Sequence, residues 1–185
     1  MCNEENYMEK NRLREIALTK RKSLNPELRK ESNLMIQKHA YEKIRDKRLV
    51  GIYVSKPDEV CTHDLIEWCF NAKIRVAVPK VNGKKIDFIE IHSFNDLKKG
   101  TFGVLEPVSN EAVDLKEFDC MIVPVVGFDA LRHRIGYGGG YYDSALDKTN
   151  CEKIGLAYAV TQVENFLSDP HDINMDVILT EYTEF

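Results

Sequence analysis

The sequence predicts an α/β fold, with a largely parallel sheet that has helices on both faces. Three observations lead to this prediction. Short apolar segments typical of strands alternate with helical segments along most of the chain, as in parallel strands joined by crossover helices. Residues 120–126 are almost wholly apolar, as expected for a central strand covered on both faces. Hydrophobic residues make up 43% of the 185 residues and charged residues 30%, which suits an ordinary globular core.

Two helices are expected to open the chain. The first covers residues 7–22, where Leu13, Ile16 and Ala17 fall on one helical face. Asn25 is a favourable N-cap and Pro26 a favourable first helical residue for the second helix, which we expect to reach about residue 46. We expect one domain over residues 1–185, in which residues 1–46 form a helical segment packed on the α/β core.

The alternating part of the chain follows these helices. We expect strands at residues 49–55, 74–78, 86–91, 120–126, 154–160 and 177–180. Helices are expected at residues 62–71 and 141–148. Asp64 and Glu67 have the spacing of a capping box, and Thr161 and Glu164 have the same spacing before a further expected helix. On such sheets, ligands bind at the carboxyl ends of the strands.

Composition excludes several classes of protein. The N-terminus is polar and acidic, unlike a signal peptide, and the longest apolar stretch (121–126) is too short to span a bilayer. We therefore expect a cytoplasmic protein with no membrane partner. Five cysteines without a Cys-x-x-Cys pair, and five scattered histidines, indicate neither a disulfide framework nor a zinc or histidine metal site.

The charge distribution has one local exception. A net charge of −4 argues against a general nucleic-acid binder. Residues 10–30 nevertheless hold eight basic residues and two acidic ones. Either this segment is a solvated helix face, or some of its cations bind a ligand.

A glycine-rich loop carries the strongest functional signal. Four of the five residues at 136–140 are glycine, and they lie between a buried strand and an expected helix. Backbone N–H groups of such a loop, together with a helix N-terminus, can converge on a phosphate. Arg134 can add charge-assisted hydrogen bonds, and Asp143 can hold Mg²⁺ against the phosphates. The alternative is a loop whose glycines only form turns. The spacing matches neither the P-loop nor the dinucleotide-binding fingerprint.

The longer string is more specific. Phe128-Asp129, Arg134 and residues 136–143 (Gly-Tyr-Gly-Gly-Gly-Tyr-Tyr-Asp) closely resemble the signature of the 5-formyltetrahydrofolate cyclo-ligase (methenyltetrahydrofolate synthetase) family. The resemblance covers nearly the whole chain. Further segments match in order: residues 10–14 with 20–21, 53–62, Pro79, 101–104 with 106–107, and 170–172 with Asp176 and 180–181.

The resemblance implies a fold and a reaction. The fold is a three-layer α/β/α arrangement, similar to the sugar-phosphate isomerase and coenzyme A transferase folds. The reaction converts 5-formyltetrahydrofolate and ATP, with Mg²⁺, to 5,10-methenyltetrahydrofolate, ADP and phosphate. The partners would be these two substrates and no nucleic acid, and the chain would be a monomer or a weak homo-oligomer.

The resemblance also implies site residues in this chain. Arg134 and Tyr142 would stabilise the phosphoryl group in transfer, and Asp143 and Asp176 would bind Mg²⁺. The folate would contact Val54, Glu59, Phe102 and Tyr141. The nucleotide would contact Lys10, Arg14, Arg134, Ile135, Gly136, Tyr137, Gly138, Gly139, Gly140, Tyr141 and Tyr142. His171 and Asp172 would shape a turn.

Two positions depart from the family pattern, and two other functions stay open. Arg132 replaces a frequent glycine and would alter the turn before Arg134, while Ser144 replaces a frequent arginine and would remove an outer phosphate contact. A sugar-phosphate isomerase on a related scaffold would use the glycine loop for the phosphate of its substrate, without ATP. A non-catalytic nucleotide- or folate-binding protein would bind without turnover.

Overall fold

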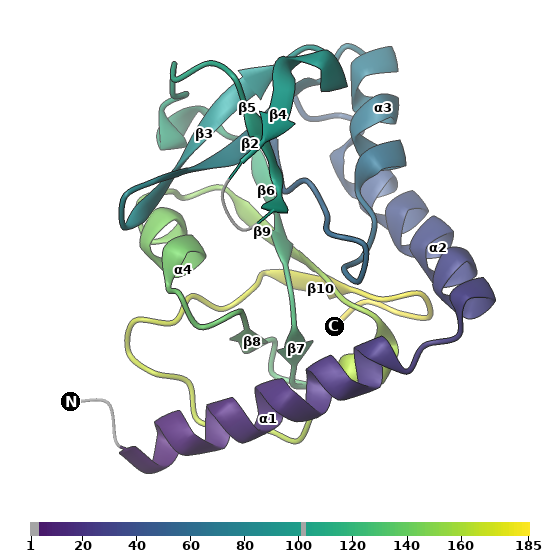
Figure 1. Ribbon diagram of the computed structural model, residues 1–185, viewed down its shortest axis with the longest axis vertical. Helices are drawn as coiled ribbons and strands as arrows, with labels where there is room; N and C mark the ends of the chain where they lie inside the picture. The colour runs from purple at the N-terminus through teal and green to yellow at the C-terminus, as the bar shows by residue number, and fades with distance from the viewer. Residues whose placement is uncertain (1–3, 101–102) are drawn as a thin grey trace.

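The computed structural model describes residues 4–100 and 103–185, and Figure 1 shows their arrangement. The helices are α1 (Glu4–Lys22), α2 (Pro26–Ile44), α3 (His63–Asn71) and α4 (Tyr141–Leu146), with 3-10 turns at η1 (Phe94–Asp96), η3 (Leu115–Glu117) and η4 (Ala159–Thr161). The strands are β1 (Leu49–Ile52), β2 (Arg75–Asn82), β3 (Lys85–Ile91), β4 (Leu97–Lys99), β5 (Leu105–Pro107), β6 (Cys120–Pro124), β7 (Gly127–Phe128), β8 (Arg134–Ile135), β9 (Glu152–Leu156) and β10 (Val177–Leu179).

The main sheet has the strand order β10-β9-β6-β1-β2-β3, six strands within the described residues. All neighbours pair in parallel except β2 and β3, so β3 is an antiparallel strand at one edge. The fully buried β6 lies near the middle, as its apolar sequence predicts. Two short antiparallel pairs, β4 with β5 and β7 with β8, lie outside the main sheet.

Side chains of the sheet alternate between two apolar layers. Val50 and Ile52 pack in a core with residues of α2 and α3, whereas Met121 and Val123 pack in a second core with Ala145 and Leu146 of α4. Figure 1 shows α2 and α3 on one side of the sheet and the short α4 on the other. The prediction of an α/β fold with a mostly parallel sheet flanked by helices is confirmed.

Helix α1 lies apart from both layers. It runs across one end of the molecule and contacts β7 and η4 (Figure 1). Leu13 and Ala17 are buried there against Val126 and Ile135 in a small apolar cluster. This placement brings the basic helix beside the residues that follow β6, where the sequence predicts the phosphate site.

Local capping signals gave mixed results. Asn25 caps α2 as predicted, because its side chain accepts a hydrogen bond from Glu27 N. The capping box predicted at Asp64 and Glu67 is wrong, since α3 begins at His63 and Asp64 lies inside the helix. The hydroxyl of Thr62, the residue before α3, donates instead to Tyr53 O at 2.6 Å.

The helix predicted after Thr161 is also wrong. Residues after η4 form an irregular segment that leads to β10. Thr161 Oγ1 donates to Tyr158 O at 2.8 Å, and Val163 N donates to Phe128 O at 2.8 Å. Because the Val163 hydrogen bond ties the segment to β7, that backbone donor is not available for a helix.

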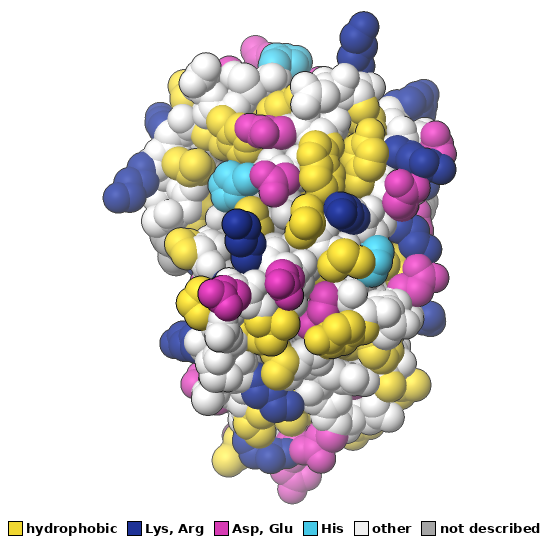
Figure 2. All heavy atoms as spheres, turned by 90° about the vertical axis from the view of Figure 1, so that its right-hand side faces the viewer, with side chains coloured by type: hydrophobic (Ala, Val, Ile, Leu, Met, Phe, Trp, Pro, Cys, Tyr) yellow, Lys and Arg dark blue, Asp and Glu magenta, His cyan; other side chains and the backbone are white. Residues whose placement is uncertain are grey.

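The surface is mixed in character. Apolar, basic and acidic side chains are interspersed over the face that Figure 2 shows. Within residues 4–100 and 103–185, no helix combines the length and the apolar character needed to cross a bilayer.

Candidate active site

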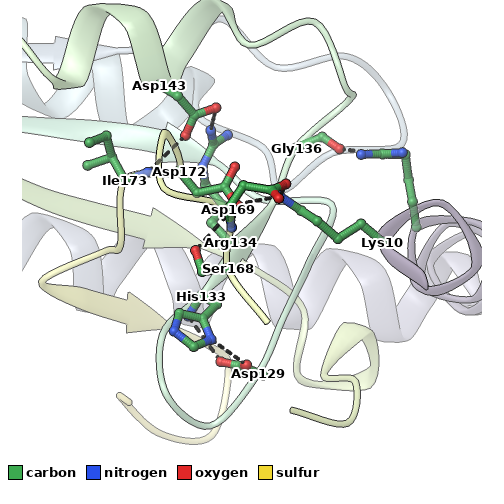
Figure 3. Close-up of polar contacts among 11 residues, drawn as sticks. Lys10, Asp129, His133, Arg134, Gly136, Asp143, Ser168, Asp169, Asp172 and Ile173 are labelled. Carbon is green, nitrogen blue, oxygen red and sulfur yellow. Dashed lines mark hydrogen bonds and ion pairs between the residues drawn. The ribbon is translucent and has the colours of Figure 1, made fainter. Parts of the chain in front are cut away.

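A tight hairpin positions Arg134. The carboxylate of Asp129, fully buried, accepts hydrogen bonds from Leu131 N and His133 N at 3.0 Å each and from Phe166 N at 3.3 Å. Its Oδ2 also lies 2.8 Å from His133 Nδ1 (Figure 3). These contacts fix the turn between β7 and β8, so the chain enters β8 with the Arg134 side chain directed inward.

Arg134 is a buried cation, and its buried Nε donor has no hydrogen-bond partner within the described residues. Its Nη2 donates to Asp143 Oδ2 at 2.8 Å (Figure 3). Its Nη1 lies 3.4 Å from Pro124 O, at the carboxyl end of β6. Asp143 Oδ1 accepts from Ile173 N at 3.2 Å, which holds the carboxylate in place.

The Tyr142 hydroxyl is a second buried donor without a partner in the described residues, and its ring lies beside Arg134. The Arg134 guanidinium lies 5.8 Å from the centre of the Tyr142 ring. Burial, reinforced by the charge of Glu59, raises the pKa of Tyr142, so this hydroxyl keeps its proton at neutral pH. Buried donors without acceptors are rare in folded proteins and indicate a ligand or water site.

The glycine loop at residues 136–140 lies against α1. Arg14 Nε donates to Gly136 O at 2.8 Å. Gly138 has φ +94°, and a Cβ there would lie 3.5 Å from the Arg14 guanidinium carbon. Gly140, at the start of α4, has φ +65°. Because both positions are left-handed, they favour glycine and leave the backbone of the loop accessible.

The aromatic and aliphatic neighbours of this loop differ in exposure. Ile135 is buried in the α1 cluster, so any contact of this residue with a nucleotide must use its backbone. A Cβ on Gly139 would lie 2.7 Å from the Tyr141 ring, which is half-buried. Ser144 is exposed on α4.

Lys10 reaches the same region from α1. Its Nζ lies 3.1 Å from Asp169 Oδ2 and also contacts Asp172 Oδ2 (Figure 3). Asp172 Oδ2 accepts from Asp169 N at 2.7 Å, so Asp172 shapes a turn as predicted. No spacing in the sequence predicts that this turn pairs with Lys10, because Lys10 and Asp172 are 162 residues apart.

Two of the residues predicted to bind folate lie in the segment that follows β1, whereas Tyr141 begins α4. Val54 and Glu59 are buried in the loop between β1 and α3. Glu59 Oε1 accepts from Tyr137 Oη at 2.7 Å, which joins this loop to the glycine loop. Phe102 lies outside the described residues.

The two predicted magnesium ligands are not joined by any hydrogen bond or ion pair within the described residues. Asp176 precedes β10, is half exposed, and accepts from Lys153 N at 2.7 Å. Asp143 lies on α4 against Arg134. No group of three or more His, Cys, Asp or Glu side chains in the described part of the chain has the arrangement of a complete metal site.

Sequence reasoning missed two supporting residues. Asp129 was noted only as part of a motif, yet it holds the hairpin that orients Arg134. Arg21 belongs to the basic segment for which the sequence predicts either a solvated face or ligand contacts, but its side chain is 2% exposed and donates to Tyr137 Oη at 2.8 Å. A buried arginine inside a basic helical run has no distinguishing sequence signal, because its partners come from distant loops.

Comparison with known proteins gives a family for this arrangement. Residues 6–181 match the sequence model of the 5-formyltetrahydrofolate cyclo-ligase family. The chain is 32% identical over 180 residues to a 5-formyltetrahydrofolate cyclo-ligase from Mycoplasma pneumoniae, covering 94% of this chain and 99% of that relative. It is 29% identical over 181 residues to a 5-formyltetrahydrofolate cyclo-ligase from Haemophilus influenzae, covering 86% of this chain and 97% of that relative.

Solved structures extend this likeness to the fold. A 5,10-methenyltetrahydrofolate synthetase from Aquifex aeolicus is similar with a TM-score of 0.85 and 32% identity, covering 95% of this chain and 91% of that one. A 5,10-methenyltetrahydrofolate synthetase from Mycoplasma pneumoniae is similar with a TM-score of 0.77 and 26% identity, covering 93% of this chain and 98% of that one.

Proposed function

The chain belongs to the 5-formyltetrahydrofolate cyclo-ligase family and is such a cyclo-ligase, and from this premise we propose how its site carries out the reaction. In this proposal the enzyme consumes ATP with Mg²⁺ and converts 5-formyltetrahydrofolate to 5,10-methenyltetrahydrofolate, ADP and phosphate. One observation carries it. Two buried donors, Arg134 Nε and the Tyr142 hydroxyl, lack acceptors within the described residues and lie beside the glycine loop.

The chemistry explains why such donors are needed. The formyl group on nitrogen is an amide, and its oxygen is a poor leaving group. Transfer of the γ-phosphoryl group to that oxygen makes it a good one. The neighbouring folate nitrogen then attacks the formyl carbon, the C–O bond breaks, phosphate departs and the nitrogen loses its proton. Since the nucleophile belongs to the same molecule, the substrate itself supplies much of the proximity.

The protein aligns the two substrates and stabilises charge on the phosphoryl group. Arg134 Nε and the Tyr142 hydroxyl donate to the phosphoryl oxygens during transfer. Lys10 and Arg14 bind the phosphates from α1, together with backbone N–H groups of the loop at 136–140. No general base is assigned, because the ring-closing nitrogen needs no activation by the protein.

Magnesium fits this site through Asp143. Mg²⁺ is usually held by one or two carboxylates together with substrate phosphates, so a complete cage of protein ligands is not required. Asp143 is part-exposed beside the glycine loop, and its pairing with Arg134 leaves further lone pairs on both oxygens. When bound, Mg²⁺ neutralises charge on the β- and γ-phosphates. Asp176 is proposed as the second ligand, and to serve it must give up its contact with Lys153.

The test follows the methenyl product by its absorbance, with purified protein, 5-formyltetrahydrofolate, ATP and Mg²⁺. Asp143→Asn is expected to lower kcat at least about 100-fold. Asp147→Asn, the same change on an exposed residue one turn further on, is the matched control and should keep wild-type activity. Full activity of Asp143→Asn would contradict the magnesium assignment, and product formation without ATP would contradict the proposed mechanism.

A further inference from the structure

Tyr137 covers the carboxylate that is proposed to bind folate. The Tyr137 hydroxyl donates to Glu59 Oε1 at 2.7 Å, and Lys56 N donates to Glu59 Oε2 at 2.7 Å. Glu59 is only 6% exposed. It forms no ion pair within the described residues, so both of its oxygens depend on these neutral donors.

Cations hold Tyr137 in this position. Arg21 Nη2 donates to Tyr137 Oη at 2.8 Å and to Asp58 Oδ2 at 2.6 Å. Lys56 Nζ lies 4.9 Å and the Arg21 guanidinium 5.6 Å from the centre of the Tyr137 ring. The hydroxyl thus accepts from one charged group and donates to another, an arrangement in which each hydrogen bond strengthens the other.

The Tyr137 hydroxyl is protonated at neutral pH. Burial of the hydroxyl, and next the negative charge of Glu59, raise the pKa of Tyr137. The tyrosine therefore acts as a donor to Glu59. The residue as a whole is 47% exposed, so the side chain can leave this contact without opening the core.

We propose that Tyr137 is a positioning residue that, in the free protein, occupies the hydrogen-bonding place on Glu59 which the pterin ring takes. This rests on the proposed role of Glu59 in folate binding. Pterin N–H donors need direct access to a carboxylate that Tyr137 now covers. Folate binding therefore releases Tyr137, and with it the glycine loop at 136–140, which then closes on the nucleotide phosphates.

This arrangement couples the two substrates. Tyr137 belongs to the loop that is proposed to hold ATP, and in this proposal the contact with Glu59 holds the loop in a position other than the nucleotide-bound one. A ligand that removes this contact shifts the loop toward the bound position. By linkage, folate then raises the affinity for nucleotide by the same factor by which nucleotide raises the affinity for folate.

The test uses Tyr137→Phe, which removes the hydroxyl and keeps the ring. Binding of 5-formyltetrahydrofolate is measured by calorimetry with and without a non-hydrolysable ATP analogue. Without nucleotide, the variant is expected to bind folate about tenfold more tightly, the worth of one hydrogen bond to a charged group. In wild type the analogue tightens folate binding at least about fivefold. In the variant that factor falls toward one.

Controls separate this inference from the proposed function. Tyr182→Phe removes a hydroxyl from a tyrosine that is 75% exposed and should match wild type in both measurements. If Glu59→Gln leaves folate affinity unchanged, the proposed role of Glu59 fails. If Glu59→Gln weakens folate binding while Tyr137→Phe binds folate equally or less tightly than wild type, only the inference fails. A wild-type coupling factor of one would also overturn it.

Discussion

Replacing Arg132 by glycine should stabilise the protein. Arg132 has φ +67° in the turn between β7 and β8, a left-handed conformation that favours glycine. Its backbone N donates to Asp129 O at 3.1 Å and its carbonyl accepts from Met175 N at 3.2 Å, so the turn keeps this conformation in spite of the side chain. The departure from the family pattern therefore leaves a left-handed residue at this turn, and Arg134 follows in its β8 position.

The size of the effect follows from two opposing terms. A left-handed conformation costs a residue with a Cβ roughly 1–2 kcal/mol. Glycine loses more backbone entropy on folding, which lowers the free energy of unfolding of the variant by about 0.5–1 kcal/mol. The net gain for Arg132→Gly is therefore about 0.5–1 kcal/mol, or roughly 1–4 °C in Tm for a chain of this size.

Urea unfolding measures this change, and Arg132→Ala is its control. Alanine removes the charge and the long side chain but keeps the Cβ, so it should gain little stability. The slope of the free energy of unfolding against urea should stay constant across the three proteins. If the glycine variant is no more stable than the alanine variant, conformational strain at residue 132 is not the cause and the reasoning fails. Cyclo-ligase activity should be unchanged, because the contacts of Asp129 remain.

Three further results are expected. Lys73→Gly should gain about 0.5–1 kcal/mol in urea unfolding, because Lys73 (φ +59°) follows the C-cap of α3 in a left-handed conformation, where Ile74 N donates to Cys69 O at 2.9 Å. Asp129→Ala should lose about 3 kcal/mol or more in the same assay, since it leaves one buried and two part-buried backbone donors without their acceptor. The His63 hydrogen bond lowers the pKa of Cys61, so its thiolate fraction is already raised at neutral pH, whereas burial raises the pKa of Cys69 to about 12. Iodoacetamide at pH 7 with peptide mapping should therefore label Cys61 ahead of Cys69. Equal labelling of the two thiols would contradict the assignment, and His63→Ala should slow the reaction of Cys61.

The elements with the strongest local signals were predictable from sequence. The apolar run that contains β6 indicated a central strand, and Asn25-Pro26 marked the start of α2. In both cases, the signal depends on neighbouring residues only. The capping-box spacing at Thr161 failed because hydrogen bonds to β7 determine the conformation of that segment.

The candidate site was predictable in part for the same reason. Arg134, the glycine loop and Asp143 lie within ten residues, so one motif carries them all, and the structure brings Arg134 and Asp143 into contact. The contacts of Lys10 with Asp172, and of Tyr137 with Glu59, join distant segments. Neither pair has a spacing that a single sequence can reveal, since the fold alone brings its members together.

The cations proposed for the nucleotide already have counter-charges in the free protein. Lys10 lies against Asp169 and Asp172, and Arg134 lies against Asp143. A triphosphate that binds these cations must displace their carboxylate partners. Its binding free energy therefore reflects the difference between the ion pairs formed with phosphate and the ion pairs lost with carboxylate. Arg134 Nε and the Tyr142 hydroxyl, which lack partners in the described residues, gain a hydrogen bond without giving one up. Under the proposed function, these two donors, rather than the paired cations, would therefore supply most of the selectivity for a phosphoryl group at this position.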